Sequence, residues 1–135
     1  MRYLIDTSAL VRIYRRQADS VWNDLADSGL VAVCEPVLAE ALVLADAKSY
    51  RQVEEKLLDS YTWVLVPDNI WDMVRAIRQE LASHSAHQGL SVADLVVAAT
   101  AIRLKLELLH EDGDFETVQR FVPQLRQRRI SDSPN

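Results

Sequence analysis

Four short apolar runs alternate with longer segments of helical character, and this alternation is the feature that most constrains the fold. The runs cover residues 3–5, 30–34, 63–66 and 106–109. Short continuous apolar runs are typical of strands that are buried on both faces. Strands separated by helices in this way predict a parallel sheet covered by helices on both sides, and therefore an α/β fold.

The segments between the runs carry start and stop signals of helices. We expect a first helix from a cap at Thr7 or Ser8, through Val21 and Leu25, to a stop at Gly29. Further helices are expected from residue 36 to about 45, over 50–61, from a cap at Asp68 to about 82, from a cap at 91, and from 114 to 121. A last edge strand is expected at residues 124–126. Residues 1–130 are expected to form one domain and residues 131–135 a disordered tail.

Composition narrows the functional class. The 135 residues are 49% hydrophobic, enough for one substantial core. The net charge of −5 argues against a broad basic face, so a polyanion would need local arginines or a metal ion. The single cysteine, Cys34, excludes an internal disulfide and favours a reducing compartment.

No apolar stretch approaches the roughly eighteen residues of a membrane span. Asp6 comes too early for a signal peptide, so we expect a cytoplasmic protein without a membrane segment.

Four acidic residues stand at the edges of apolar segments, where carboxylates are rarely found without a partner: Asp6, Glu40, Asp94 and Asp112. Asp6 and Asp112 follow expected strands, whose carboxyl ends share one edge of a parallel sheet. Two carboxylates about 5 Å apart repel by roughly 3 kcal/mol at an effective dielectric constant near 20. Mg²⁺ or Mn²⁺ would remove this conflict, because both prefer oxygen ligands. Carboxylates, a divalent cation and water are the components of phosphodiester hydrolysis.

Each acid also has a structural interpretation. Asp6 could cap a helix, and Asp94 has the capping-box spacing from Ser91. Asp112 or Asp114 could occupy a turn or a cap. Glu40 is the hardest to explain in this way, because no Lys or Arg lies within one helical turn of it, although a solvated helix face stays open. The joint pattern is more specific than any single member.

At these acids the chain resembles the PIN-domain nucleases, in particular the VapC-type toxins of bacterial toxin–antitoxin pairs. The resemblance covers nearly the whole chain, and its motifs are Tyr-Leu-Ile-Asp-Thr-Ser-Ala-Leu at 3–10, Pro-Val-Leu-Ala-Glu at 36–40, Gly-Leu-Ser-Val-Ala-Asp at 89–94 with Ala-Ala-Thr-Ala at 98–101, and Asp-Gly-Asp-Phe at 112–115. It implies a single-domain α/β/α sandwich with a mainly parallel central sheet. It also implies a Mg²⁺- or Mn²⁺-dependent endoribonuclease that hydrolyses RNA with a metal-activated water, a homodimer, and a VapB-like antitoxin that blocks the site.

Carried over by motif, the acidic cluster would consist of Asp6, Glu40, Asp94 and Asp112. Asp6 and Asp94 would be direct metal ligands, and Glu40 would act through a water or help to orient it. Asp112 would complete the pocket, and Asp114 could substitute for it or support it. Thr7 or Ser8 would offer a hydroxyl. The chain departs from the family at residues 111–114, where three acids replace the usual two. The fourth ligand therefore stays open between Asp112 and Asp114.

Three arginines of the first helix, Arg12, Arg15 and Arg16, lie close to Asp6 in the sequence. They could bind RNA phosphates or form a solvated helix face. A second basic group, Arg126, Arg128 and Arg129, is expected to be a solvated end of the chain. His110 precedes the acidic loop, and a strand-end histidine without a catalytic role is the expectation there. The tryptophans at 22, 63 and 71 fit core or dimer positions better than base stacking.

The alternative function is a non-catalytic, metal-binding α/β domain for signalling or partner binding. Receiver-like domains also gather acids and Mg²⁺ at strand ends. They need a phosphorylatable Asp after a middle strand and a lysine near the site. By sequence order the middle strands end at Cys34-Glu35 and Val66-Pro67-Asp68, and no lysine follows the last acidic loop. Both observations count against this alternative.

Overall fold

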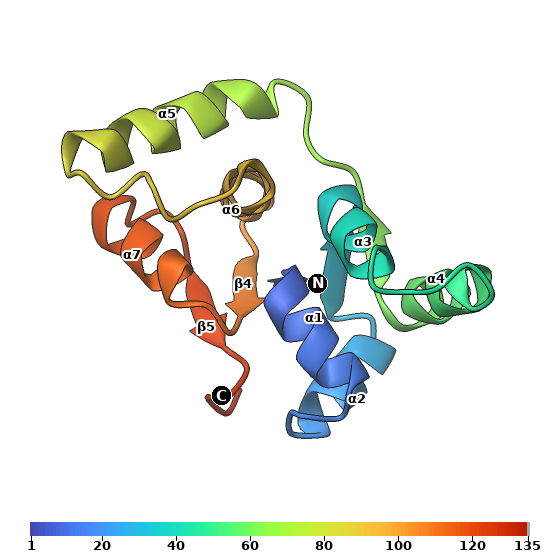
Figure 1. Ribbon diagram of the computed structural model, residues 1–135. Coiled ribbons are helices and arrows are strands. Elements are labelled where there is room, and N and C mark those ends of the chain that lie inside the picture. Colours follow the sequence, from blue (N-terminus) through green and yellow to red (C-terminus); the bar gives the residue numbers. More distant parts are fainter. Residues whose placement is uncertain (135) are drawn as a thin grey trace.

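Five parallel strands form one sheet in the order β3-β2-β1-β4-β5 in the computed structural model, which describes residues 1–134 (Figure 1). The strands are β1 (Tyr3–Ile5), β2 (Val31–Cys34), β3 (Thr62–Val64), β4 (Glu107–His110) and β5 (Gln127–Arg129). Every pairing is parallel, with Leu4 opposite Ala32 on one side and Leu108 on the other. The predicted α/β fold is therefore confirmed. Of the expected disordered tail, Asn135 lies outside the described residues.

Burial of the inner strands explains why their sequences are apolar throughout. Every residue of β1 and β2 is buried, which requires helices on both faces of the sheet. Cys34 lies at the end of β2 as a buried, free thiol. The edge strands β3 and β5 are more exposed, and accordingly they carry polar residues.

The helices are α1 (Thr7–Tyr14), α2 (Val21–Asp27), α3 (Glu35–Leu42), α4 (Tyr50–Ser60), α5 (Ile70–Ser83), α6 (Val92–Leu104) and α7 (Gly113–Phe121). The long α5 lies outermost and packs on α6 and α7, whereas α1 packs on α3 and β4 (Figure 1). Helix α6 is apolar around most of its circumference because it lies between α5 and the sheet. No helix of residues 1–134 is both long and apolar enough to cross a membrane.

The prediction of one continuous first helix is wrong. Helix α1 ends at Tyr14, and Arg16 adopts a left-handed conformation with φ of 58°. Helix α2 then begins at Val21, whose amide donates to the Asp19 carboxylate over 2.9 Å. The stop at Gly29 is confirmed, with φ of 77° and a hydrogen bond from the Leu30 amide to the Leu25 carbonyl. The first helix is capped by Asp6 rather than by Thr7 or Ser8.

Other boundaries also differ from expectation. Helix α3 ends at Leu42 rather than near residue 45, and β3 ends at Val64 rather than at residue 66. Asn69, not Asp68, precedes α5, and its φ of 61° turns the chain without a side-chain cap. The last strand begins at residue 127, three residues later than expected, because a turn closed by the Leu125 amide and the Val122 carbonyl occupies the predicted position.

The tryptophans divide between core and surface. Trp22 is buried, whereas Trp63 and Trp71 are 43% and 59% exposed, so the core assignment is right for Trp22 alone. The Trp22 ring stands edge-on to Tyr3 with a centroid separation of 5.6 Å. Its indole N–H donates to the carbonyl of Ile130 over 2.8 Å. This bond fastens the segment after β5 to α2.

We predict that Trp22→Phe lowers the free energy of unfolding by about 2 kcal/mol. The substitution removes the indole donor and leaves the buried Ile130 carbonyl without its partner. Urea denaturation followed by circular dichroism measures the loss. Trp71→Phe, at an exposed position, is the matched control and should change stability by less than about 0.5 kcal/mol. Equal losses in the two variants would contradict the assigned bond.

Candidate active site

The strand order places a switch point at the carboxyl edge of the sheet, and we call the region between the ends of β1 and β4 there the crevice. From β1 the chain proceeds to β2 on one side and later returns to β4 on the other, so the switch in direction lies between β1 and β4. Open α/β sheets bind ligands at such a point. Asp6 directly follows β1, and Glu111 and Asp112 directly follow β4. Asp6 and Asp112 are thus neighbours across the crevice although 106 positions separate them in the sequence.

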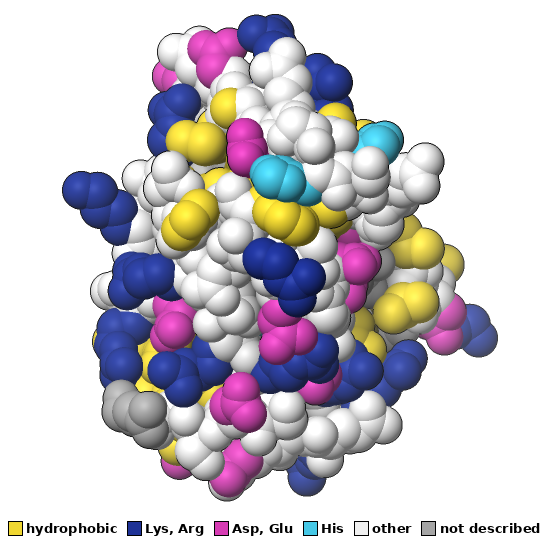
Figure 2. All heavy atoms as spheres, turned by 90° about the vertical axis from the view of Figure 1, so that its left-hand side faces the viewer, with side chains coloured by type: hydrophobic (Ala, Val, Ile, Leu, Met, Phe, Trp, Pro, Cys, Tyr) yellow, Lys and Arg dark blue, Asp and Glu magenta, His cyan; other side chains and the backbone are white. Residues whose placement is uncertain are grey.

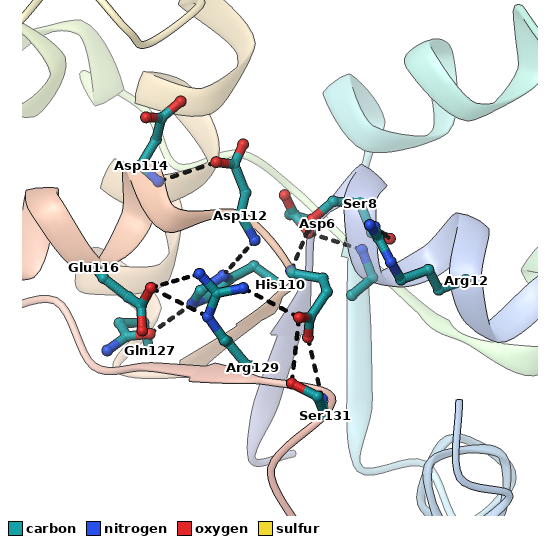
Figure 3. Close-up of polar contacts among 12 residues, drawn as sticks. Asp6, Ser8, Arg12, His110, Asp112, Asp114, Glu116, Gln127, Arg129 and Ser131 are labelled. Atoms are coloured by element: carbon teal, nitrogen blue, oxygen red, sulfur yellow. Dashed lines mark hydrogen bonds and ion pairs between the residues drawn. The ribbon is translucent and has the colours of Figure 1, made fainter. Parts of the chain in front are cut away.

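Three carboxylates lie close enough to share one cation. Asp94, Asp112 and Asp114 each offer an oxygen, and these oxygens lie within 4.8 Å of one another. Asp94 comes from the first turn of α6. Asp112 caps α7, and Asp114 lies in the first turn of α7 (Figure 3). The pKa of Asp114 is raised by burial and then by the charges of Asp112 and Asp94.

Asp6 is the most buried acid of the site, at 5% exposure. Burial raises its pKa to about 6, although hydrogen bonds from Ala9 and Ser8 oppose the rise, and the charge of Asp94 adds to it. The Ala9 amide donates to its Oδ1 over 3.1 Å and the Ser8 hydroxyl over 2.8 Å. Asp6 therefore caps α1 and belongs to the same charged group as Asp94.

Glu40 reaches the crevice from α3. Its Oε1 accepts a hydrogen bond of 2.7 Å from the Thr7 hydroxyl, which joins α3 to α1. The pKa of Asp94 is raised by burial and further by the charges of Asp112 and Glu40, against hydrogen bonds with Ser91. The structure thus brings all four predicted acids and Asp114 into one electrostatic group.

The capping role of Asp94 is present alongside its place in this group. Its amide donates to the Ser91 hydroxyl over 3.1 Å, and its Oδ2 accepts from the Ser91 amide over 3.2 Å, which completes a capping box. Because the same carboxylate shares the crevice with Asp112 and Asp114, the two interpretations of Asp94 do not exclude each other.

The donor set fits a hard divalent cation. Within residues 1–134 none of the five acids forms an ion pair, and burial raises the pKa of Asp6, Asp94 and Asp114. All the offered atoms of the cluster are carboxylate oxygens, which suit Mg²⁺ or Mn²⁺ rather than zinc. A cation would relieve both the desolvation and the mutual repulsion of these groups.

A buried histidine holds the acidic loop. The Nδ1 of His110 accepts a hydrogen bond of 3.0 Å from the Asp112 amide, so Nε2 carries the proton and donates to Gln127. Gln127 in turn donates to Gln119 over 2.7 Å. Burial lowers the pKa of His110, which agrees with a neutral ring. The sequence did not predict this role, because the partner glutamine lies on another strand.

Arg129 stabilises the same loop from β5. It pairs with Glu111 at 3.1 Å and with Glu116 at 2.7 Å (Figure 3). The prediction of a solvated basic end is therefore wrong for Arg129. The Ser8 hydroxyl, which donates to Asp6, also accepts from the Glu111 amide over 2.9 Å and so ties the ends of β1 and β4 together.

The three predicted RNA-binding arginines are not placed together. Arg12 and Arg16 line a cavity of about 450 Å³ beside Glu111 and Ser131. Arg15 lines a different groove of about 270 Å³, bordered by α1, α3 and α4. The face formed by α5, α7 and β5 shows Lys and Arg interspersed with Asp and Glu and no continuous basic patch (Figure 2).

Comparison with known proteins decides the family, because the PIN domain model matches residues 3–120. The chain is 36% identical to ribonuclease VapC6 of Mycobacterium tuberculosis, over 74% of this chain and 80% of that protein. The chain belongs to the PIN-domain family, among the VapC ribonucleases. The DNA-bound VapBC of Salmonella typhimurium has the same fold, with a TM-score of 0.79 at 16% identity over 96% of this chain and 98% of that one. VapBC-5 of M. tuberculosis, a member of the VapBC family of toxin–antitoxin systems, gives a TM-score of 0.67 at 22% identity, over 95% of this chain and 98% of that one.

Membership of the VapC family settles the choice against the receiver-like alternative, although one argument against that alternative was wrong. The central strand of the sheet is β1, so an aspartate, Asp6, does follow a middle strand. The positions of the three lysines still count against a receiver-like site, which needs a lysine beside its acids. Lys48 precedes α4, Lys56 lies within it, and Lys105 lies at the opposite end of β4 from the acidic loop.

We predict that Asp6→Asn stabilises the cation-free protein at pH 8 by up to about 3 kcal/mol, which corresponds to a pKa difference of about 2. The pKa of Asp6 is about 6 in the folded protein against 3.8 ordinarily, so the folded state binds the proton more tightly. This stabilising contribution is full below about pH 4 and is lost as the pH rises through 6. Asparagine keeps the helix cap without the charge.

The measurement is urea denaturation in EDTA at pH 8 and again at pH 4.5. The advantage of Asp6→Asn should shrink at the lower pH, because Asp6 is then protonated and uncharged. Asp59→Asn, at an exposed site on α4, is the matched control and should show no such change. An advantage of equal size at both values would refute the link to the charge of Asp6.

Proposed function

We propose that this protein is a Mg²⁺- or Mn²⁺-dependent endoribonuclease that acts as the toxin of a toxin–antitoxin pair. One observation carries the proposal: the oxygens of Asp94, Asp112 and Asp114 lie within 4.8 Å of one another, and the charge of Asp94 also interacts with those of Asp6 and Glu40. None of these five acids has an ion-pair partner among the described residues. Its relative VapC6 is a ribonuclease. The acid-lined crevice suits a substrate whose phosphates meet the protein through a cation.

Asp6, Asp94 and Asp112 would hold the cation, and Asp114 is the candidate for a fourth ligand. The oxygens of Asp94, Asp112 and Asp114 lie within 4.8 Å of one another, and Asp6 joins this group through the interaction of its charge with that of Asp94. When bound, the cation supplies positive charge that neutralises a phosphate oxygen and makes a coordinated water more acidic. The Ser8 hydroxyl orients Asp6, and His110 fixes the loop that carries Asp112. These contacts keep the ligands in position before the substrate arrives, which limits the reorganisation needed during the reaction.

Glu40 would receive the proton of the attacking water. It is the exposed acid of the group, and the hydrogen bond from Thr7 fixes its orientation. Hydrolysis adds the water oxygen to phosphorus and breaks the bond from phosphorus to the 3′ oxygen. The departing oxygen takes up a proton and becomes a hydroxyl. The roles of Thr7 and Ser8 in this scheme are to position carboxylates rather than to react.

An antitoxin partner and a homodimer complete the proposal. Support for the antitoxin comes from VapBC-5, a member of a toxin–antitoxin family. The groove between α1, α3 and α4 and the nearby exposed Tyr14, Val43 and Leu44 suit a protein partner. The exposed Trp63 and Trp71 support a second interface between copies of this chain. An RNA substrate and the reduced Cys34 support a cytoplasmic location.

We predict that Asp6→Asn and Asp94→Asn each lower RNA cleavage by roughly 100-fold or more, because each removes part of a preorganised electrostatic site. The assay incubates purified protein with tRNA, rRNA and mRNA in Mg²⁺, Mn²⁺ or EDTA and maps the RNA ends. EDTA should abolish cleavage, and Asp59→Asn should cleave as the wild type does. Cleavage in EDTA, or full activity in Asp94→Asn, would refute the proposed function.

The same assay separates the candidates for the fourth ligand. If Asp112 holds the cation directly, Asp112→Asn loses activity to the same extent as Asp94→Asn, whereas Asp114→Asn loses less. The reverse order would assign the ligand to Asp114. Comparison at several Mg²⁺ concentrations tells weaker cation binding from a lower maximal rate.

A further inference from the structure

The geometry points to a phosphate subsite beside the acidic crevice: Arg12 and Arg16 bind the RNA backbone phosphate that flanks the cleaved one. This inference rests on the proposed function, because it names where the same RNA chain continues past the reacting phosphodiester. Of the three arginines near the end of α1, Arg12 and Arg16 contact RNA in this proposal and Arg15 does not.

The subsite is the cavity of about 450 Å³ between the end of α1 and the segments that follow β4 and β5. One residue joins it to the acidic crevice. The Ser8 hydroxyl contacts both Asp6 and the Glu111 amide, while the Ser8 carbonyl accepts from the Arg12 guanidinium over 3.0 Å (Figure 3). A strand of RNA with one phosphate at Asp6 therefore has the next within reach of Arg12.

The two acids that line this cavity are already engaged. Glu111 pairs with Arg129 and accepts from the Ser131 amide and hydroxyl over 3.1 and 3.2 Å. Asp19 accepts from the Val21 amide at the start of α2. The charge of Glu111 is thus compensated by Arg129, which lowers the repulsion that a phosphate would meet on that side of the cavity, whereas Asp19 keeps its charge and accepts only one backbone hydrogen bond.

The two arginines are available for a ligand. Among residues 1–134 neither forms an ion pair, and Arg12 makes only the bond to the Ser8 carbonyl. Arg16 is exposed and ends α1 in the left-handed region, which is unfavourable for a residue with a side chain.

Two other arginines near the crevice, Arg129 and Arg15, are not placed to bind this phosphate. Arg129 is neutralised by Glu111 and Glu116, and Arg15 borders the groove on the α3 and α4 side of α1. The net charge of −5 offers no general attraction for RNA, and the face seen in Figure 2 mixes basic with acidic side chains. A polyanion that approaches five carboxylates needs at least one localised cationic contact, and this cavity supplies two.

The first test measures binding apart from cleavage. In an Asp94→Asn background, fluorescence anisotropy follows a short single-stranded RNA that spans a cleavage site mapped with the wild type. Arg12→Ala and Arg16→Gly should each weaken binding by about tenfold and reduce the slope of log Kd against log salt concentration by about 0.7. Arg78→Ala, an exposed arginine on α5, is the matched control and should bind as the background does. Arg16→Gly relaxes the left-handed backbone, so its melting temperature should not fall.

The second test assigns the contact to one phosphate. A neutral methylphosphonate replaces the linkage next to the cleaved one, and Arg16→Gly should then cost no further affinity. With the neutral linkage placed elsewhere, the tenfold loss should persist. The subsite would be overturned if Arg12→Ala and Arg16→Gly bound RNA as tightly as Arg78→Ala does. An equal loss of affinity in Arg15→Ala, or a loss that does not depend on the position of the neutral linkage, would overturn it as well. Absence of metal-dependent cleavage by the wild type would instead refute the proposed function, so the two failures are distinguishable.

Discussion

Mutual repulsion among carboxylates is the constraint on which the rest of this structure depends. At about 5 Å, each pair of charges costs roughly 3 kcal/mol at an effective dielectric constant near 20, and a domain's whole net stability is about 5–15 kcal/mol. Only a rigid scaffold can hold such a group together in the absence of a cation. Strands β1 and β2, buried on both faces, supply that scaffold. Burial is the largest cause of the raised pKa values of Asp6, Asp94 and Asp114, and the charges of neighbouring carboxylates raise them further.

Helix N-termini offset part of this cost. Asp6 caps α1, Asp112 caps α7, and Asp94 completes the capping box of α6, so three helices direct their amide ends toward one crevice. Each N-terminus carries a partial positive charge that favours a nearby carboxylate by about 0.3–1 kcal/mol. The capping and metal-binding interpretations of these residues are therefore two aspects of one arrangement. The caps orient the carboxylates, and the residual repulsion leaves them suited to a cation.

Prediction from sequence was strongest where the determinants are local. Apolar runs located the strands, and Ser91, Gly29 and Pro36 marked helix ends correctly because capping and backbone preference act within a few residues. It failed at Arg16, where a left-handed residue that is not glycine divides the first helix, and it missed the helix-start signal of Asp19, which accepts from the Val21 amide. It also missed His110 and Arg129. Their partners, Gln127 and Glu111, lie 17 and 18 positions away, and only the pairing of β4 with β5 brings them into contact.

The sequence by itself determined the α/β class, the four acids and the family motifs, because hydrophobic periodicity and motif spacing are properties of the linear chain. Three features depend on the tertiary structure: β1 is the central strand, the oxygens of Asp114 lie close to those of Asp94 and Asp112, and Arg15 lines a different groove from Arg12 and Arg16. The physical reason is that the order of strands in a parallel sheet follows from how helices pack between them. Contacts between residues a hundred positions apart depend on that order and leave no local trace in the sequence.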